Sequence, residues 1–248
     1  MSKRKQPAGP VRSRLGLGSQ RVSGAARTTS SAADPVSSAT SGRTRPTSKR
    51  LTQAERTALS DARMLDATVQ LIDERGTHNT TLKEVGERAG YSRGLASSRF
   101  GSKEALFFEL LDQFNRRWKE ESANAVGLRH GLAAFRAANN GLVAFFRAEA
   151  KFIRVMYMVA YEMVGSSELM RTQLAGQHEA YRHGIARWIR EGVADGEALR
   201  GIDPDRIAIQ YVAGVFGIIY QWLVSPDSVD CARALEDLRE NTLQLILS

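Results

Sequence analysis

The sequence predicts an all-α protein, in which an N-terminal three-helix helix-turn-helix domain is followed by a helical-bundle domain. Apolar residues recur at spacings of three and four from residue 51 onward, and no stretch shows the alternation typical of a strand. Caps and glycine stops divide this pattern into separate helices. The 248 residues, 42% of them hydrophobic, suffice for two cores. We therefore expect a tail over 1–50, the first domain over 51–102 and the second over 103–248.

The stretch 80–103, TTLKEVGERAGYSRGLASSRFGSK, predicts two short helices joined by a tight turn. Thr81 and Glu84 form a capping-box pair at the start of the first helix, and Gly90 ends it. Ser92 is expected to cap the second helix. The inward positions are Leu82, Val85, Gly86 and Ala89 in the first helix, and Ala96 and Phe100 in the second. This is the spacing of a helix-turn-helix motif.

The outward face of the second predicted helix is small, hydroxylated and basic. It consists of Arg93, Gly94, Ser97 and Ser98. Such a face suits a helix that enters the major groove of DNA and offers donors to base edges and phosphates. The alternative is a purely structural helical hairpin.

With its flanks, this stretch resembles the DNA-binding domain of the TetR family of transcriptional regulators. Five motifs occur in the family's order and spacing: R-x-L-D-A from Arg63, E-R-G from Glu74, T-T-x-x-x-V from Thr80, R-A-G-x-S-R-G from Arg88 and F-G-S-K-E from Phe100. The sequence departs from the family where members often carry T-L-Y and a His before the Phe. These places hold Leu95, Ala96, Ser97 and Arg99. The missing Tyr removes a common phosphate contact, Arg99 could replace it electrostatically, and Leu95 could meet a thymine methyl group.

The resemblance implies a homodimeric, ligand-responsive repressor of transcription that binds a palindromic operator in double-stranded DNA. The residues expected in the major groove are Arg93, Gly94, Leu95, Ser97, Ser98 and Arg99, and those expected on phosphates are Arg63, Thr80, Thr81, Ser92 and Lys103. A small-molecule effector in the second domain would tilt the fourth helix and spread the two DNA-reading heads. The alternative is an effector-independent architectural DNA-binding protein that relies on a basic tail.

Nine helices in all fit the pattern of the sequence, including the two described above. The first runs from Leu51 to about Glu74, with Gly76 as its stop and an inner stripe of Ala58, Ala62, Leu65, Val69 and Ile72. The fourth runs from Lys103 to about Ala125 after a Ser102 cap, with Leu106, Leu110, Phe114 and Trp118 as its apolar row. Five more are expected over about 132–148, 151–163, 167–194, 204–224 and 228–247.

Aromatic and methionine residues gather in and after the segment 145–163. A bundle interior with Met and Tyr is adaptable and partly polar, which describes a small-molecule cavity, although ordinary core is the alternative for each residue. The resemblance places the effector in this domain. The candidates for an apolar or aromatic effector are Met156, Tyr157, Tyr161, His178, Tyr181 and Trp188.

Small and bulky residues alternate on one stripe of the segment 204–224, which permits close packing against another helix. This stripe consists of Tyr211, Gly214, Val215, Ile218 and Trp222. The resemblance assigns the last two helices to a two-fold dimer interface. An intramolecular bundle is the alternative.

Residues 1–50 are rich in Ser, Thr, Gly, Pro and Arg and show no periodicity, so we expect them to be disordered. They hold eleven basic residues against one acidic residue, a net charge of +10, which leaves −2 of the chain's +8 for residues 51–248. The tail is predicted either to track DNA electrostatically or to be a solvated extension or a misassigned start.

Catalysis, metal binding and cofactors are not expected. His178 and His183 are five residues apart, so they point away from one another on a helix, and Cys231 has no nearby His to activate it. The single cysteine fits a reducing compartment. Without an apolar run of 18 residues or a secretory signal, we expect a cytoplasmic protein without membrane contact.

Overall fold

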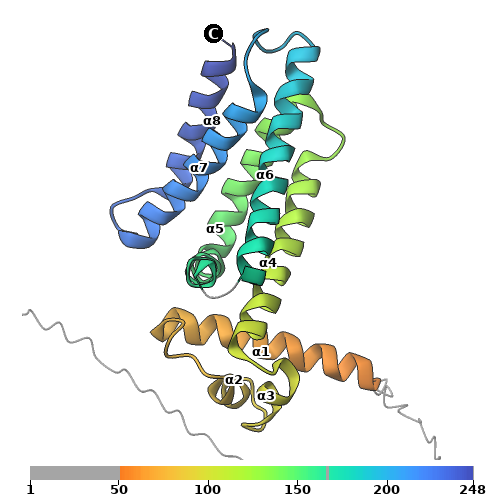
Figure 1. The fold of residues 1–248 in the computed structure, drawn as a ribbon, viewed down its shortest axis with the longest axis vertical. Helices are drawn as coiled ribbons and strands as arrows, with labels where there is room; N and C mark the ends of the chain where they lie inside the picture. The colour runs from red at the N-terminus through yellow and green to blue at the C-terminus, as the bar shows by residue number, and fades with distance from the viewer. Residues whose placement is uncertain (1–50, 166–167, 248) are drawn as a thin grey trace, which may run out of the picture. The chain divides into compact units, whose positions relative to one another are not determined.

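The computed structural model describes residues 51–165 and 168–247, and these fold into helices without any strand (Figure 1). The predicted all-α fold is confirmed. The disorder expected for residues 1–50 concerns a segment outside the described residues.

The first unit consists of α1 (Gln53–Arg75), α2 (Leu82–Arg88) and α3 (Leu95–Phe100). A capping box at Thr52 and Glu55 starts α1, and Gly76, with φ 81°, ends it as predicted. The predicted capping box of Thr81 and Glu84 starts α2. Ser92 does not cap α3, because the N-cap is Gly94 and makes no side-chain cap hydrogen bond.

The core of this unit lies against the C-terminal half of α1. Buried positions of α1 begin at Met64 and end at Ile72, and Val85 of α2 and Ala96 of α3 complete the core. Ala58 and Ala62, which were predicted to face inward, are exposed. The short helices α2 and α3 cover only the later turns of α1, so the periodic stripe continues beyond the part that is buried.

Helix α4 (Lys103–Val126) leaves this unit and enters the second domain (Figure 1). The Ser102 hydroxyl accepts from the backbone N–H of Ala105 at 3.1 Å, which confirms the predicted cap. The first turns of α4 are buried in the core of the first unit, which is called the DNA-reading unit below. Further along, Phe114 and Trp118 pack on Phe145, with ring centroids 6.0 and 5.8 Å apart.

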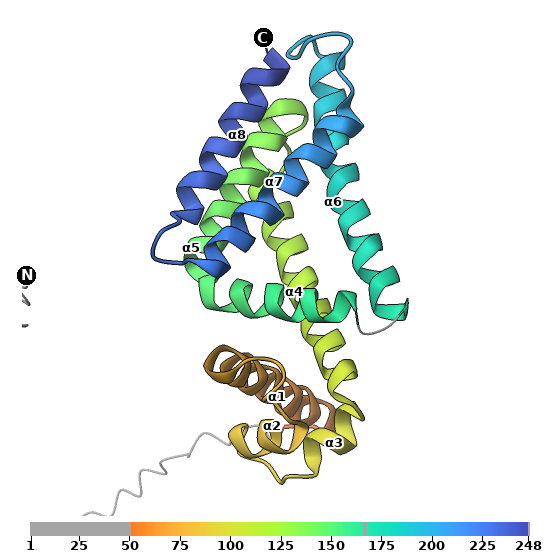
Figure 2. The ribbon, with the colours of Figure 1, turned by 60° about the vertical axis from the view of Figure 1, so that its left-hand side comes forward.

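The two helices expected over 132–148 and 151–163 are the arms of one bent helix, α5 (Gly131–Val164). The backbone at Glu149 is non-helical, with φ −127° and ψ 28°, and the Glu149 carboxylate accepts from Arg117 of α4 at 2.8 Å. The break falls where the apolar pattern was interrupted, but it bends the helix rather than ending it. The described residues therefore hold eight helices, not nine. Figure 2 shows the second arm turned away from the first and running above α1.

The bundle is completed by α6 (Glu168–Ala194), α7 (Pro204–Val224) and α8 (Cys231–Leu247). Asp203 caps α7 by accepting from the backbone N–H groups of Asp205 and Arg206, with Pro204 at the first helical position, as predicted. α8 begins three residues later than expected, and Asp230 accepts from the N–H of Arg233. Among the described residues, only α7 is long and apolar enough to cross a membrane, a test that core helices also pass.

Candidate functional site

The turn between α2 and α3 is held by a close backbone approach. The N–H of Tyr91 donates to the carbonyl of Gly86 at 2.9 Å, and the N–H of Leu95 donates to the carbonyl of Ser92 at 3.1 Å. A Cβ on Gly86 would lie only 2.7 Å from the Ser92 carbonyl oxygen. Gly90 supplies the left-handed conformation between them, with φ 82°. The position of α3 relative to α2 is therefore tightly constrained.

This constraint leaves one face of α3 and its preceding turn open to solvent. The exposed residues are Ser92, Arg93, Gly94, Ser97, Ser98 and Arg99, while Ala96 is fully buried. Leu95 is the exception among the predicted groove residues. It is half-buried and packs against the core, so we do not retain a contact between Leu95 and a thymine methyl group.

Each exposed arginine of this face is paired with a carboxylate from another helix. Arg93 donates through Nε to Oε1 of Glu87 on α2. Arg99 donates through Nε and Nη2 to the two oxygens of Asp61 on α1, at 2.7 and 2.6 Å. In both pairs the carboxylate binds the Nε side of the guanidinium, so each arginine keeps donors on its Nη atoms for another acceptor.

The residues predicted to hold phosphates divide into two groups. Arg63 and Ser92 are exposed. Thr80 is 1% exposed and its hydroxyl donates to the carbonyl of Gly76 at 2.9 Å, which contradicts a phosphate contact through its side chain. The Thr81 hydroxyl is engaged in the capping box, where it donates to Oε2 of Glu84 at 2.6 Å.

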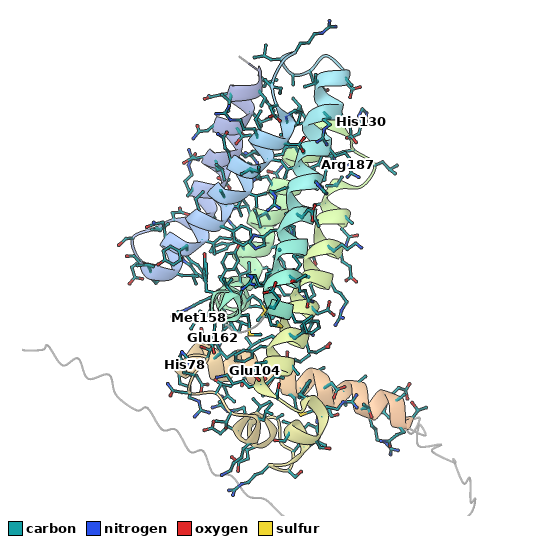
Figure 3. The ribbon with its side chains drawn as sticks, in the orientation of Figure 1. His78, Glu104, His130, Met158, Glu162 and Arg187 are labelled. Atoms are coloured by element: carbon teal, nitrogen blue, oxygen red, sulfur yellow. The ribbon has the colours of Figure 1, made fainter. Side chains whose placement is uncertain are left out.

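Lys103 is also occupied within the chain. Its ammonium donates to the carbonyl of Thr77 at 2.9 Å and lies 3.8 Å from Oε1 of Glu162 on the second arm of α5. Figure 3 shows Glu162 and Met158 at the level where α5 meets the DNA-reading unit. The structure therefore favours a bracing role for Lys103 over the predicted phosphate contact.

Three of the six predicted effector residues gather around one aromatic ring that the sequence did not single out, Phe216 of α7, and a fourth joins them indirectly. His178 stacks on Phe216 at 4.3 Å between ring centroids, and Tyr157 and Tyr181 lie at 5.4 and 6.5 Å. Tyr161 joins through Tyr157 at 6.3 Å. The sequence pattern assigned two aromatic residues of α7, Tyr211 and Trp222, to a dimer contact. It gave no role to Phe216, which lies next to Val215 of that stripe in the sequence.

The remaining two predicted effector residues lie elsewhere. Met156 is 1% exposed and belongs to the core shared with the DNA-reading unit, and Trp188 packs in the core between α6, α7 and α8. Their packing favours the ordinary-core interpretation for these two residues.

Burial sets the protonation of the polar groups in this aromatic cluster. It raises the pKa of Tyr157 well above its ordinary value and that of Tyr181 to about 12. The Tyr181 hydroxyl donates to Oδ1 of Asn115 on α4 at 2.9 Å, a partner that no sequence pattern indicated. Burial also lowers the pKa of His178, and the charge of Arg182 adds to this effect. The cluster thus presents neutral rings and hydroxyl groups.

The stripe predicted to form the dimer interface faces the inside of the chain. Tyr211 is 4% exposed, packs edge-on against Phe135 and accepts from the Asn139 side chain at 2.5 Å. A Cβ on Gly214 would lie 2.9 Å from Leu238 of α8, and Trp222 packs on Phe146 at 4.8 Å. Val215 and Ile218 are half-buried in the same cores. Of these five residues only Tyr211 is fully buried, and the contacts described for all of them lie within the chain, which favours the intramolecular alternative. Their part in a dimer contact stays a prediction.

Two family descriptions match the chain and together span more than half of it. "Bacterial regulatory proteins, tetR family" matches residues 64–110, which hold most of the helix-turn-helix unit. "BetI-type transcriptional repressor, C-terminal" matches residues 153–247, from the second arm of α5 to the end of α8.

Similar proteins carry both domains. The HTH-type transcriptional regulator TtgR of Pseudomonas putida is 25% identical over 199 residues, which cover 75% of this chain and 90% of that protein. The fatty acid metabolism regulator protein of Bacillus subtilis is 24% identical over 190 residues, covering 75% and 92%.

Solved structures share the fold. A complex of SmeT with triclosan has a TM-score of 0.65 at 19% identity, covering 76% of this chain and 92% of that chain. The fatty acid degradation regulator FadR from Bacillus halodurans has a TM-score of 0.65 at 16% identity, covering 79% and 97%. With the tetR-family match on the helix-turn-helix and a repressor-type match on the bundle, the chain belongs to the TetR family of DNA-binding transcriptional regulators.

Proposed function

We propose that this protein is a homodimeric repressor that reads a palindromic operator through α3 and is released from it by a small molecule. The observation that carries the proposal is the face formed by α3 and its preceding turn, where two arginines and three serines are exposed, and which the close Gly86–Ser92 contact fixes. Such residues can reach base edges and phosphates when α3 enters the major groove. Relatives with the same domain order include SmeT, described as the repressor of a multidrug efflux pump of Stenotrophomonas maltophilia.

The dimer interface that we propose uses the opposite face of α7 from the one that the sequence indicated. Large apolar side chains are exposed on this opposite face. The space beside Gly217 is open, because no other side chain lies within 4 Å of a Cβ added there. The exposed residues of this face are Ile209, Ala213, Gly217, Tyr220 and Val224. A contiguous apolar face of this kind is stabilised by a second copy packed across a two-fold axis.

The second arm of α5 connects the proposed effector site with the DNA-reading unit. Tyr157 and Tyr161 of this arm lie in the aromatic cluster, whereas Met156 and Val159 lie in the core that includes Met64 of α1. An effector that displaces the aromatic rings therefore acts on a helix whose other side is packed against the reading head. In this mechanism the arm and α4 move together, which changes the separation of the two α3 helices.

The effector that we propose is a neutral molecule of apolar or aromatic character. The site offers neutral rings and hydroxyl groups, and SmeT, which shares the fold, has been solved with triclosan. A chlorinated phenol such as triclosan is therefore a rational first probe. An effector should raise the melting temperature of the protein and release it from its operator.

The experiment that tests the proposed function is the selection of bound sequences from random duplex DNA by the purified full chain. We expect an inverted repeat whose half-sites lie about one helical turn or slightly more apart. Recovered sites without inverted symmetry contradict the dimeric arrangement. Persistence of operator binding through a wide panel of apolar and aromatic molecules favours instead an effector-independent architectural protein.

A further inference from the structure

The DNA-reading unit has no net charge. Residues 51–102 contain seven basic and seven acidic residues, so their formal charges cancel. DNA-binding proteins ordinarily gain most of their sequence-independent affinity from cations that replace the counterions of phosphates. A neutral reading unit lacks this general attraction. The basic residues are Arg56, Arg63, Arg75, Lys83, Arg88, Arg93 and Arg99, and the acidic residues are Glu55, Asp61, Asp66, Asp73, Glu74, Glu84 and Glu87.

The carboxylates are placed on the arginines of the reading face in a particular orientation. Glu87 binds the Nε of Arg93, and Asp61 binds the Nε and one Nη of Arg99. The side chains of the two arginines are still 69% and 44% exposed. Because a guanidinium has five N–H donors in a fixed plane, a carboxylate on the Nε side leaves outward N–H groups on both Nη atoms. That end is the one that can donate bidentately to O6 and N7 of guanine.

We infer that Asp61 and Glu87 are specificity-determining residues, which hold Arg99 and Arg93 in position for guanine edges and cancel their attraction to phosphates. This inference rests on the proposed function, in which α3 reads an operator. Both roles follow from the same contact. A carboxylate that holds the planar guanidinium in one orientation lowers the entropic cost of a bidentate contact with a base. The same carboxylate balances the positive charge of the guanidinium, so its attraction to a phosphate is weak.

Loss of either carboxylate should affect binding to random duplex DNA and binding to the operator differently. On random duplex, an arginine released from its carboxylate becomes free to bind a phosphate. On the operator, the released arginine is no longer held in the orientation that suits a bidentate contact with guanine. Removing the carboxylate should therefore raise the affinity for random DNA without a parallel rise on the operator, so the ratio of the two affinities falls.

The test compares Asp61→Asn and Glu87→Gln with Glu74→Gln in the full chain. Glu74 is a matched control because it pairs with Arg88 at 2.8 Å on a helix end outside the reading face. Fluorescence anisotropy would measure binding to random duplex and to the operator selected by the wild-type protein, each across a salt series. Thermal melting would verify that every variant is folded.

For Asp61→Asn and Glu87→Gln, we expect the affinity for random duplex to rise by roughly 2- to 30-fold in a dimer, since an exposed ion pair is worth a factor of roughly 1.5 to 5 per protomer. The log–log salt slope should steepen by about 0.9 for each additional phosphate that the protein neutralises. The preference for the operator should fall roughly five-fold or more. Glu74→Gln should change both affinities alike.

An unchanged operator preference in Asp61→Asn and Glu87→Gln would overturn the inference and leave the proposed function intact. An equal loss of operator preference in Glu74→Gln would also overturn it, because only the net charge would then matter. A wild-type protein that selects no sequence would refute the proposed function and this inference with it. If Asp61→Asn does not fold, Glu87→Gln alone carries the test, because the Glu87 side chain is 40% exposed and pairs with Arg93 on the same face. It should lower the ratio of operator affinity to random-duplex affinity, and an unchanged ratio would refute the positioning role.

Discussion

Replacing Gly86 by alanine should disturb the turn that positions the reading helix. The new methyl would lie 2.7 Å from the Ser92 carbonyl oxygen, about 0.7 Å inside ordinary van der Waals contact. Overpacking of this kind lowers the free energy of unfolding by about 1–3 kcal/mol, and the better helix propensity of alanine offsets about 1 kcal/mol of that loss. The net loss of about 1 kcal/mol should lower the melting temperature by roughly 2–4 °C for a chain of this size.

The larger effect of Gly86→Ala should be on operator binding. The obstructing atom belongs to the backbone of the turn, so the turn must move and α3 must move with it. Losing one bidentate base contact costs about 1–3 kcal/mol, which anisotropy on the selected operator would detect as roughly a 5- to 150-fold weaker affinity. Binding to random duplex should change much less, because phosphate contacts tolerate small shifts.

Gly94→Ala is the matched control for this variant. Gly94 has an ordinary backbone conformation, with φ −88° and ψ −13°, and no atom lies within 4 Å of an added Cβ. Its melting temperature should therefore stay at the wild-type value, and any loss of binding would report a direct clash with DNA at the start of α3. If Gly86→Ala retains both its melting temperature and its operator affinity, the turn is not the constraint that we describe.

Four further variants test the rest of the structure. Ala213→Arg should shift the protein from dimer to monomer in sedimentation analysis. Tyr211→Phe should remain dimeric and lose about 1 kcal/mol of stability, because it loses a buried hydrogen bond. Dissociation of the dimer by both variants would support a dimer contact through the stripe that contains Tyr211. Because burial lowers the pKa of folded His178, the unfolded state binds more protons, so stability should fall as pH drops through 6.5, and His178→Phe should flatten that fall in melting curves. Deletion of 1–50 should reduce the salt slope on random duplex by about 2.7 per chain if about three of its cations contact phosphate, with operator preference kept; an identical slope would show that the tail does not engage DNA.

The sequence predicted most completely those features that depend on neighbouring residues. The capping box at Thr81, the N-cap at Ser102, the stop at Gly76 and the proline start of α7 are all local, and all are confirmed. The exposure of Arg93 also followed from helical spacing. The carboxylate partner of Arg99 did not, because Asp61 is 38 residues from Arg99 and no periodicity connects them.

Bends and polar networks escaped prediction for a related reason. The apolar pattern stops near residue 149, but only the Arg117–Glu149 pair and the packing of both arms decide whether the chain ends a helix there or bends it. Likewise Thr80 and Lys103 carry side chains typical of phosphate contacts. Their actual partners are backbone carbonyls in the α1–α2 turn, which a linear pattern of polar residues cannot reveal.

The sequence could not assign the two sides of α7, for a specific physical reason. A helix that is apolar nearly all round has no single inner stripe, so spacing alone cannot separate the side that packs within the chain from the side that meets a partner. Both sides of α7 carry a glycine: Gly214 lies against Leu238, and Gly217 is open. Small residues next to bulky ones thus indicated close helix packing, and the structure shows such packing within the chain, against Leu238. Since the chain itself covers this side, the dimer that we propose uses the exposed apolar residues on the opposite side.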